Sequence, residues 1–274
     1  MILLSFGCVY FLWGGTFLAM RYGVQVMPPL MLASVRYLIA GPALLVICAI
    51  LRVRIWSNWR EMRILALIGV LMLGLGNTLI LWSELYLSSG LTALLAATIP
   101  LYAVLIETFL PNDGRLPARG WVGVFLGFCG LVFLMWPRLQ SSRQGEWEQM
   151  IAACVALFGA FCWTAASVIS RRATIRIRGL AAAAWQMLFG SIFLTIVMFA
   201  SGRYHGATWG VQAWSATLYL VVLGSLVGYS SYIYLLEHVP VTKVATYAYV
   251  NPVIAVALGA LFLQERFVAV EYVG

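Results

Sequence analysis

The sequence predicts an all-α integral membrane protein of about ten spans, and three observations predict it. Of its 274 residues, 63% are hydrophobic and only 9% are charged, whereas about a quarter of a soluble domain is charged. The apolar residues fall in separate runs of about 20 residues, which is the length that crosses a membrane as a helix. Landmark residues also recur in the same order in the two halves of the chain.

The spans follow one another through short loops rich in Arg, Pro, Gly and Ser. Open strands cannot survive in lipid, and the runs are about twice as long as a barrel strand, so we expect helices. The predicted spans cover 2–24, 30–51, 63–87, 90–110, 117–137, 148–170, 179–201, 213–236 and 240–264. The first run is too long for a cleavable signal peptide and has Trp13 at its centre. A tenth run begins near Val268 and reaches Gly274, which is too short to cross.

The charge of the chain indicates its orientation rather than a nucleic-acid partner. The formal net charge is +8, but the basic residues lie in short loops between apolar runs. Most of them fall in loops that are cytoplasmic if the N-terminus is cytoplasmic, and they are densest at 171–178. We therefore expect a multi-pass membrane protein with its N-terminus in the cytoplasm, and no nucleic-acid binding.

The chain repeats itself at an offset near 150 residues. The matched pairs are Trp13 and Trp163, Arg21 and Arg171, Gly76 and Gly228, and Pro100 and Pro252. The predicted units are 1–137 and 148–274. Each carries five spans, an odd number, so the second unit must be inverted in the membrane, as in many transporters. A further match of Trp121 with Tyr272 implies that the tenth helix is incomplete in this chain.

The middle of the spans holds the candidate substrate-binding residues, because transporters tend to bind substrate near the bilayer midplane. Aromatic rings would contact an apolar or cationic group of a substrate, and Asn and Tyr groups would bind its polar groups. The candidates are Trp13, Thr16, Asn77, Trp82, Trp163, Trp185, Tyr229, Tyr232, Tyr247 and Asn251. Pro100 and Pro252 remove a backbone hydrogen bond at mid-depth, which predicts hinges that line a cavity, or simple bends without a ligand role.

Two charges lie within predicted spans, where charges are costly and often functional. Arg36 and Glu84 fall at a similar predicted depth near the outer side. They are expected to form an ion pair, either as a structural or interfacial feature or as an outer gate with a proton-sensitive carboxylate.

Patterns for catalysis and metal binding are missing. The two histidines fall at opposite ends of predicted spans, and no HExxH, GxSxG or GxxxxGK occurs. The five cysteines lie in apolar runs without CxxC spacing. We expect no enzyme activity, no cofactor and no metal. Gly123 and Gly127 share a helix face and favour close packing within a monomer, with dimerisation as the alternative.

Several motifs resemble the EamA-type permeases of the drug/metabolite transporter superfamily. They are Trp82-Ser83-Glu84 with 89–101 in the first half, 244–255 with Gln264-Glu265-Arg266 in the second, and 13–17 and 36–41 in the first two spans. The resemblance covers nearly the whole chain. It implies a ten-helix fold of two inverted repeats in a bacterial inner membrane, with both termini in the cytoplasm. It also implies export of amino acids or related metabolites by alternating access. The chain departs from the family in lacking most of the tenth helix.

The sequence therefore predicts an exporter of small metabolites, in particular neutral or aromatic amino acids. One alternative is a proton-coupled exporter of drugs or quaternary ammonium compounds that uses Glu84. An integral-membrane enzyme and a passive scaffold are the other classes. The enzyme lacks a visible nucleophile and base, and the scaffold does not explain the polar residues in the middle of the spans.

Overall fold

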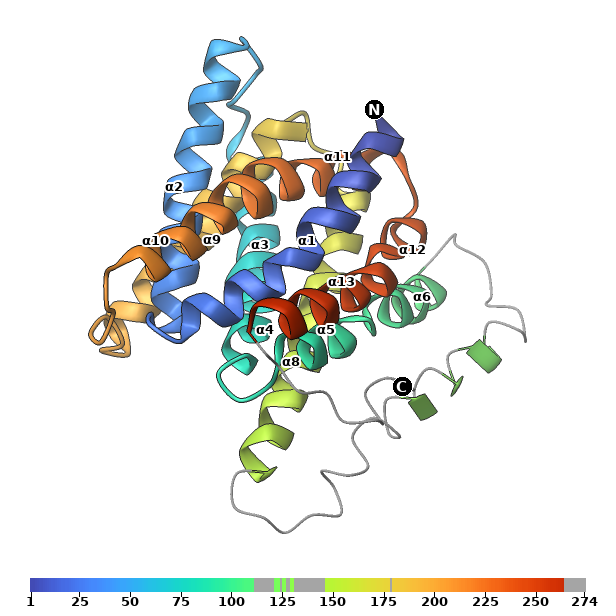
Figure 1. Ribbon diagram of the computed structural model, residues 1–274. Coiled ribbons are helices and arrows are strands. Elements are labelled where there is room, and N and C mark those ends of the chain that lie inside the picture. The colour runs from blue at the N-terminus through green and yellow to red at the C-terminus, as the bar shows by residue number, and fades with distance from the viewer. Residues whose placement is uncertain (111–120, 124, 127–128, 131–145, 178, 264–274) are drawn as a thin grey trace.

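The structure is a computed structural model that describes residues 1–110, 121–123, 125–126, 129–130, 146–177 and 179–263 (Figure 1). Within these residues, every regular element is a helix. The first half contains α1 (Ile2–Val24), α2 (Pro29–Ile50), α3 (Trp59–Gly69), η1 (Val70–Asn77), α4 (Thr78–Ser83), α5 (Ser89–Ala96) and α6 (Ile99–Phe109). The second half contains α8 (Glu146–Arg172), α9 (Gly179–Ala200), α10 (Val211–Tyr219), η2 (Leu220–Tyr229), α11 (Ser230–His238), α12 (Val241–Val244) and α13 (Tyr247–Phe262).

Eight helical segments in the described part of the chain are long and apolar enough to cross a membrane. They agree with eight of the predicted spans, and the ends differ by a few residues. The chain is therefore a multi-pass, all-α membrane protein. The predicted span over 117–137 and the short tenth run lie largely or wholly outside the described residues.

Two predicted spans are interrupted in the structure. The fourth span breaks between Ala96 and Ile99, just before Pro100. The ninth breaks between Val244 and Tyr247, while Pro252 lies inside α13. In both segments a short helix, α5 or α12, is therefore followed by a longer one, α6 or α13.

The third and seventh of these eight segments share a different irregularity. Each is one helical rod whose middle part is a π-helix, η1 in the first half and η2 in the second. A π-helix is wider than an α-helix and is uncommon outside functional sites. The sequence analysis did not predict either one, although paired glycines mark both segments (Gly74 with Gly76, Gly224 with Gly228).

The two halves pack through exchanged contacts. Helix α1 packs against η2 and α11, and its counterpart α8 packs against η1 and α4. Helices α2 and α9 pack closely against each other, and there Gly41 lies against the backbone of Leu188. In Figure 1, α1 and α13 lie side by side, although they come from opposite ends of the chain.

Connecting loops gather at two ends of the bundle. At one end, the carboxylate of Glu61 accepts a hydrogen bond of 2.8 Å from the backbone N–H of Arg176, in the loop after α8. At the other end, the backbone N–H of Thr208 donates to the carbonyl of Val26 over 2.8 Å. Successive loops thus alternate between the ends, as membrane-spanning helices require.

Candidate functional site

A narrow cavity lies among the mid-span residues of both halves. Its free volume is about 50 Å³, which is room for only a few water molecules. The lining residues are Trp13, Thr16, Phe17, Met20, Arg36, Tyr37, Leu73, Asn77, Ile80, Ala93, Ala96, Ile99, Trp163, Tyr229, Tyr247, Ala248 and Asn251. Seven of the ten residues proposed from the sequence are among them.

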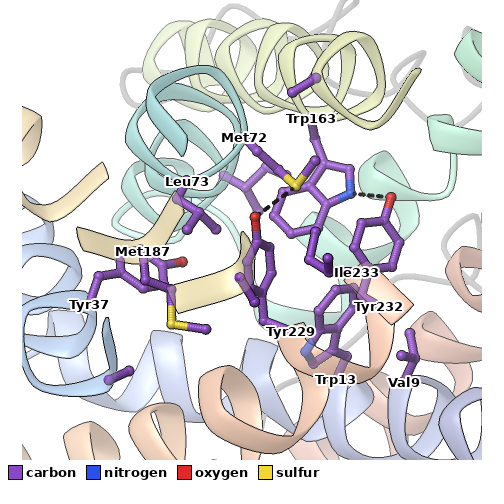
Figure 2. Packing of buried hydrophobic residues seen from close by; sticks show 14 of the residues in the cluster. Val9, Trp13, Tyr37, Met72, Leu73, Trp163, Met187, Tyr229, Tyr232 and Ile233 are labelled. Carbon is purple, nitrogen blue, oxygen red and sulfur yellow. Dashed lines mark hydrogen bonds between the residues drawn. The ribbon is translucent and has the colours of Figure 1, made fainter. Parts of the chain in front are cut away.

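Aromatic rings form one wall of the cavity. Figure 2 shows Trp13, Trp163 and Tyr229 close together. The ring centroid of Trp13 lies 5.5 Å from that of Trp163, 5.0 Å from Tyr232 and 5.1 Å from Tyr247. Trp163 also packs against Tyr229, with centroids 6.2 Å apart. Three of these four pairs are edge-to-face, a geometry that is favourable beyond the area that the rings bury. Residues far apart in the sequence thus make one continuous aromatic cluster.

Hydrogen bonds hold these rings in place. The indole N–H of Trp163 donates to the hydroxyl of Tyr232 over 3.1 Å, and that hydroxyl also pairs with Ser167 at 2.7 Å. Tyr229 donates to the side-chain carbonyl of Gln186 over 2.6 Å. Figure 2 shows Tyr232 beside Trp163, although Tyr232 is not a lining residue of the cavity. Tyr232 therefore supports the aromatic wall from behind.

The π-helices allow the two tryptophans to approach. The indole N–H of Trp13 donates to the carbonyl of Gly224 in η2 over 3.0 Å. A Cβ atom on Gly228 would overlap the Trp13 indole, and one on Gly76 would lie 2.9 Å from the backbone nitrogen of Trp163. Each π-helix thus uses a glycine to receive the tryptophan of the opposite half.

A polar corner faces part of the cavity. It consists of Arg36, Tyr37, Asn77 and Ser225, and the first three line the cavity. The Arg36 guanidinium donates from Nε to the Ser225 hydroxyl over 2.8 Å and from Nη1 to Asn77 Oδ1 over 3.4 Å. Tyr37 donates to the same Asn77 oxygen over 2.6 Å. Tyr37 and Ser225 are not among the residues predicted from the sequence, although Tyr37 adjoins Arg36 and Ser225 adjoins Gly224.

Arg36 lines the cavity, whereas Glu84 does not. The contacts of the Arg36 guanidinium lie at the level of Asn77. Glu84 follows seven residues later in the chain, about 10 Å along the helix at 1.5 Å per residue. The Glu84 side chain is fully buried, and Arg21 donates a hydrogen bond to its main-chain carbonyl. Arg36 thus lies deeper than its place in the sequence indicated.

The remaining predicted residues divide into two groups. Asn251 lines the cavity and, with its amide oriented to donate, bonds to the carbonyls of Tyr10 and Tyr247 at 3.0 and 3.3 Å. Trp82 instead packs against Tyr86, with centroids 5.1 Å apart, outside the set of lining residues. Trp185 does not line the cavity either.

Trp185 is tied to the loop after α2. Its indole N–H donates to the carbonyl of Ile55 over 2.6 Å, and its ring packs against Trp56 and Phe189. It stands at the end of the bundle that carries Glu61, and it does not line the cavity.

The mid-span prolines border the cavity indirectly. A proline cannot donate to the carbonyl four residues earlier, and for Pro100 and Pro252 those carbonyls belong to Ala96 and Ala248. Both alanines line the cavity. The interrupted helices therefore put polar backbone groups next to this space.

Membrane-length helices from both halves of the chain surround a cavity at mid-depth. This is the architecture expected of a solute carrier. The EamA-like transporter family matches residues 1–136 and again 150–274. The chain belongs to this family of drug/metabolite transporters, so it is a membrane transporter and not an enzyme.

Curated relatives cover nearly the whole chain. The "Uncharacterized inner membrane transporter YedA" of Escherichia coli K12 is 32% identical over 265 residues, which are 96% of this chain and 83% of that protein. The "Uncharacterized transporter YoaV" of Bacillus subtilis is 26% identical, covering 97% of this chain and 89% of its own length. A "Probable amino-acid metabolite efflux pump" of E. coli K12 is 24% identical, covering 97% and 88%.

A solved crystal structure has the same fold. It superposes with a TM-score of 0.72 at 19% identity and covers 99% of this chain and 92% of its own. At this identity the likeness extends to the fold alone.

Proposed function

We propose that this transporter exports amino acids with neutral or aromatic side chains across a bacterial inner membrane. The observation that carries the proposal is the cavity, which has an aromatic wall next to a polar corner. An amino acid has the matching chemistry, with an apolar or aromatic side chain at one end and charged groups at the other. The printed description of one relative as an amino-acid metabolite efflux pump supports the same class of substrate.

We propose alternating access between two inverted units, 1–137 and 148–274, with the N-terminus in the cytoplasm. The exchanged packing of α1 with η2 and of α8 with η1 supports this division. A cavity of about 50 Å³ is smaller than an amino acid, so binding requires the walls to separate. Pro100 and Pro252 interrupt or weaken helices at this depth and serve as hinges. We propose that it acts as a monomer, with a dimer as the alternative.

Transport of neutral and aromatic amino acids is expected in proteoliposomes that contain the purified protein. The measurement is counterflow of radiolabelled amino acids, with a panel of unlabelled competitors, in the presence and absence of a proton gradient. Aromatic and neutral amino acids should compete, while sugars and quaternary ammonium compounds should not. Counterflow indistinguishable from that of empty liposomes for every amino acid would contradict the proposal.

The alternative of a proton-coupled drug or quaternary ammonium exporter depends on Glu84. Two observations weigh against this alternative. Glu84 does not line the cavity, and the cationic Arg36 does. A cation in the wall repels a cationic substrate.

Glu84→Gln is therefore expected to leave the rate of amino-acid transport and its pH dependence unchanged. The substitution keeps the shape of the side chain and removes its ability to ionise. Transport is measured at several pH values after size-exclusion chromatography shows that the variant is monodisperse. A pH dependence that disappears in Glu84→Gln would favour the proton-coupled exporter instead.

A further inference from the structure

Arg36 is a buried cation in the wall of the cavity. Its side chain is 5% exposed, and it lies on α2, in the interior of a membrane-spanning helix. Its guanidinium carbon lies 4.9 Å from the centre of the Tyr37 ring. A charged side chain at this depth costs several kcal/mol unless a partner compensates it, so its surroundings decide what it does.

The groups that contact the Arg36 guanidinium among the described residues are neutral. They are the Ser225 hydroxyl, the Asn77 amide oxygen and the Tyr37 ring. Neutral groups solvate a guanidinium but do not cancel its charge.

Among the described residues that line the cavity, Arg36 is the only charged one, and no carboxylate is among them. Glu61 binds the backbone of the loop after α8, and Glu237 accepts from the backbone N–H of Gly179 over 2.6 Å. Glu84 follows Asn77 by about two helical turns and lies beside Arg21. The cavity therefore presents positive charge, and a negatively charged group of a ligand would compensate it.

The polar corner is arranged to receive such a group. Asn77 Oδ1 accepts from both Tyr37 and Arg36, which leaves the Asn77 amide hydrogens to donate elsewhere. The Nη2 atom of Arg36 lies beside Gly224 in η2, since a Cβ atom placed on Gly224 would lie 2.8 Å from it. A guanidinium fork beside an amide donor matches the two oxygens of a carboxylate.

We propose that Arg36 binds the carboxylate of the transported substrate and that this contact determines specificity. The inference rests on the proposed function and narrows it, because the substrate must carry a carboxylate and its apolar part then faces Trp13 and Trp163. Amines of the same shape without a carboxylate are not substrates.

Three ligands test the proposal, because they differ in one charged group at a time. Phenylalanine has both groups, phenethylamine lacks the carboxylate, and 3-phenylpropionate lacks the ammonium. Binding to detergent-purified protein is followed by the fluorescence of the cavity tryptophans and by the shift in melting temperature. Wild-type protein is expected to bind phenylalanine and 3-phenylpropionate and to reject phenethylamine.

Arg36→Gln should weaken binding of both carboxylates by about 10- to 100-fold, the range of one charge-assisted hydrogen bond. Arg36→Lys should lose less affinity for both carboxylates, because lysine keeps the positive charge but lacks the planar guanidinium that can bind two oxygens at once. Arg21→Gln is the matched control, since it removes an arginine that contacts Glu84 outside the cavity. It should bind all three ligands as the wild-type protein does.

The outcomes separate this inference from the proposed function. Phenethylamine binding as tightly as phenylalanine overturns the role of Arg36 even if Arg36→Gln does not fold. Unchanged amino-acid binding by folded Arg36→Gln overturns it too, and leaves amino-acid transport standing. If the wild-type protein binds 3-phenylpropionate but binds no amino acid, the carboxylate site is supported and amino-acid transport is refuted. If the wild-type protein binds neither 3-phenylpropionate nor any amino acid, both the role of Arg36 and the proposed amino-acid transport are refuted.

Discussion

Trp163→Ala is expected to reduce amino-acid transport to the level of empty liposomes. The Trp163 ring contacts Trp13, Tyr229 and Tyr232 at centroid distances between 5.4 and 6.2 Å. Truncation to alanine removes the centre of the aromatic wall and the hydrogen bond to Tyr232. Loss of a buried tryptophan costs about 3–5 kcal/mol in a well-packed core, so transport must be compared at equal amounts of monodisperse protein.

Two further variants make this result interpretable. Trp163→Phe keeps an aromatic ring without the indole N–H and should retain part of the transport activity. Trp82→Ala removes a tryptophan that packs against Tyr86 outside the lining of the cavity, so it should transport normally. Undiminished transport by Trp163→Ala would remove this residue from the substrate pathway.

Gly76→Ala is expected to destabilise the protein more than any other single methyl addition in η1. The new Cβ would lie 2.9 Å from the backbone nitrogen of Trp163, and backbone cannot rotate away as a side chain can. Overpacking of this kind costs about 1–3 kcal/mol and forces α8 away from η1. The melting temperature in detergent should fall, and transport should fall with it because Trp163 moves.

Gly7→Ala is the matched control for this substitution. Gly7 lies in α1, and a Cβ atom there would have nothing within 4 Å. Alanine favours a helix over glycine by about 0.5–1 kcal/mol, so Gly7→Ala should be neutral or slightly stabilising. Equal melting temperatures for the two variants would show that η1 and α8 do not pack as closely as the structure has them.

The number and positions of the spans could be predicted from the sequence because lipid imposes one strict requirement. Backbone polar groups must be satisfied within the segment, so each long apolar run becomes a helix. Depth along a helix follows from position in the run. This is why the sequence alone places Trp13, Trp163 and Asn77 at mid-depth.

Rotation about each helix axis could not be predicted in the same way. In a soluble protein, polar residues mark the face that meets water, but here the face towards lipid is as apolar as the face towards the core. Trp82 and Trp185 therefore looked equivalent to Trp13 in the sequence, although only Trp13 lines the cavity.

The tertiary structure alone decided the chemistry of the site. The π-helices η1 and η2 depend on packing against α8 and α1, and a glycine pair does not predict them. Arg36 donates a hydrogen bond to Ser225 in the other half of the chain, 189 residues away. The sequence determined which groups lie in the membrane and at what depth, because hydration and hydrogen bonding act on each segment separately. Only the packing of both halves determined which groups face one another, because that depends on the rotation of helices whose faces are all apolar.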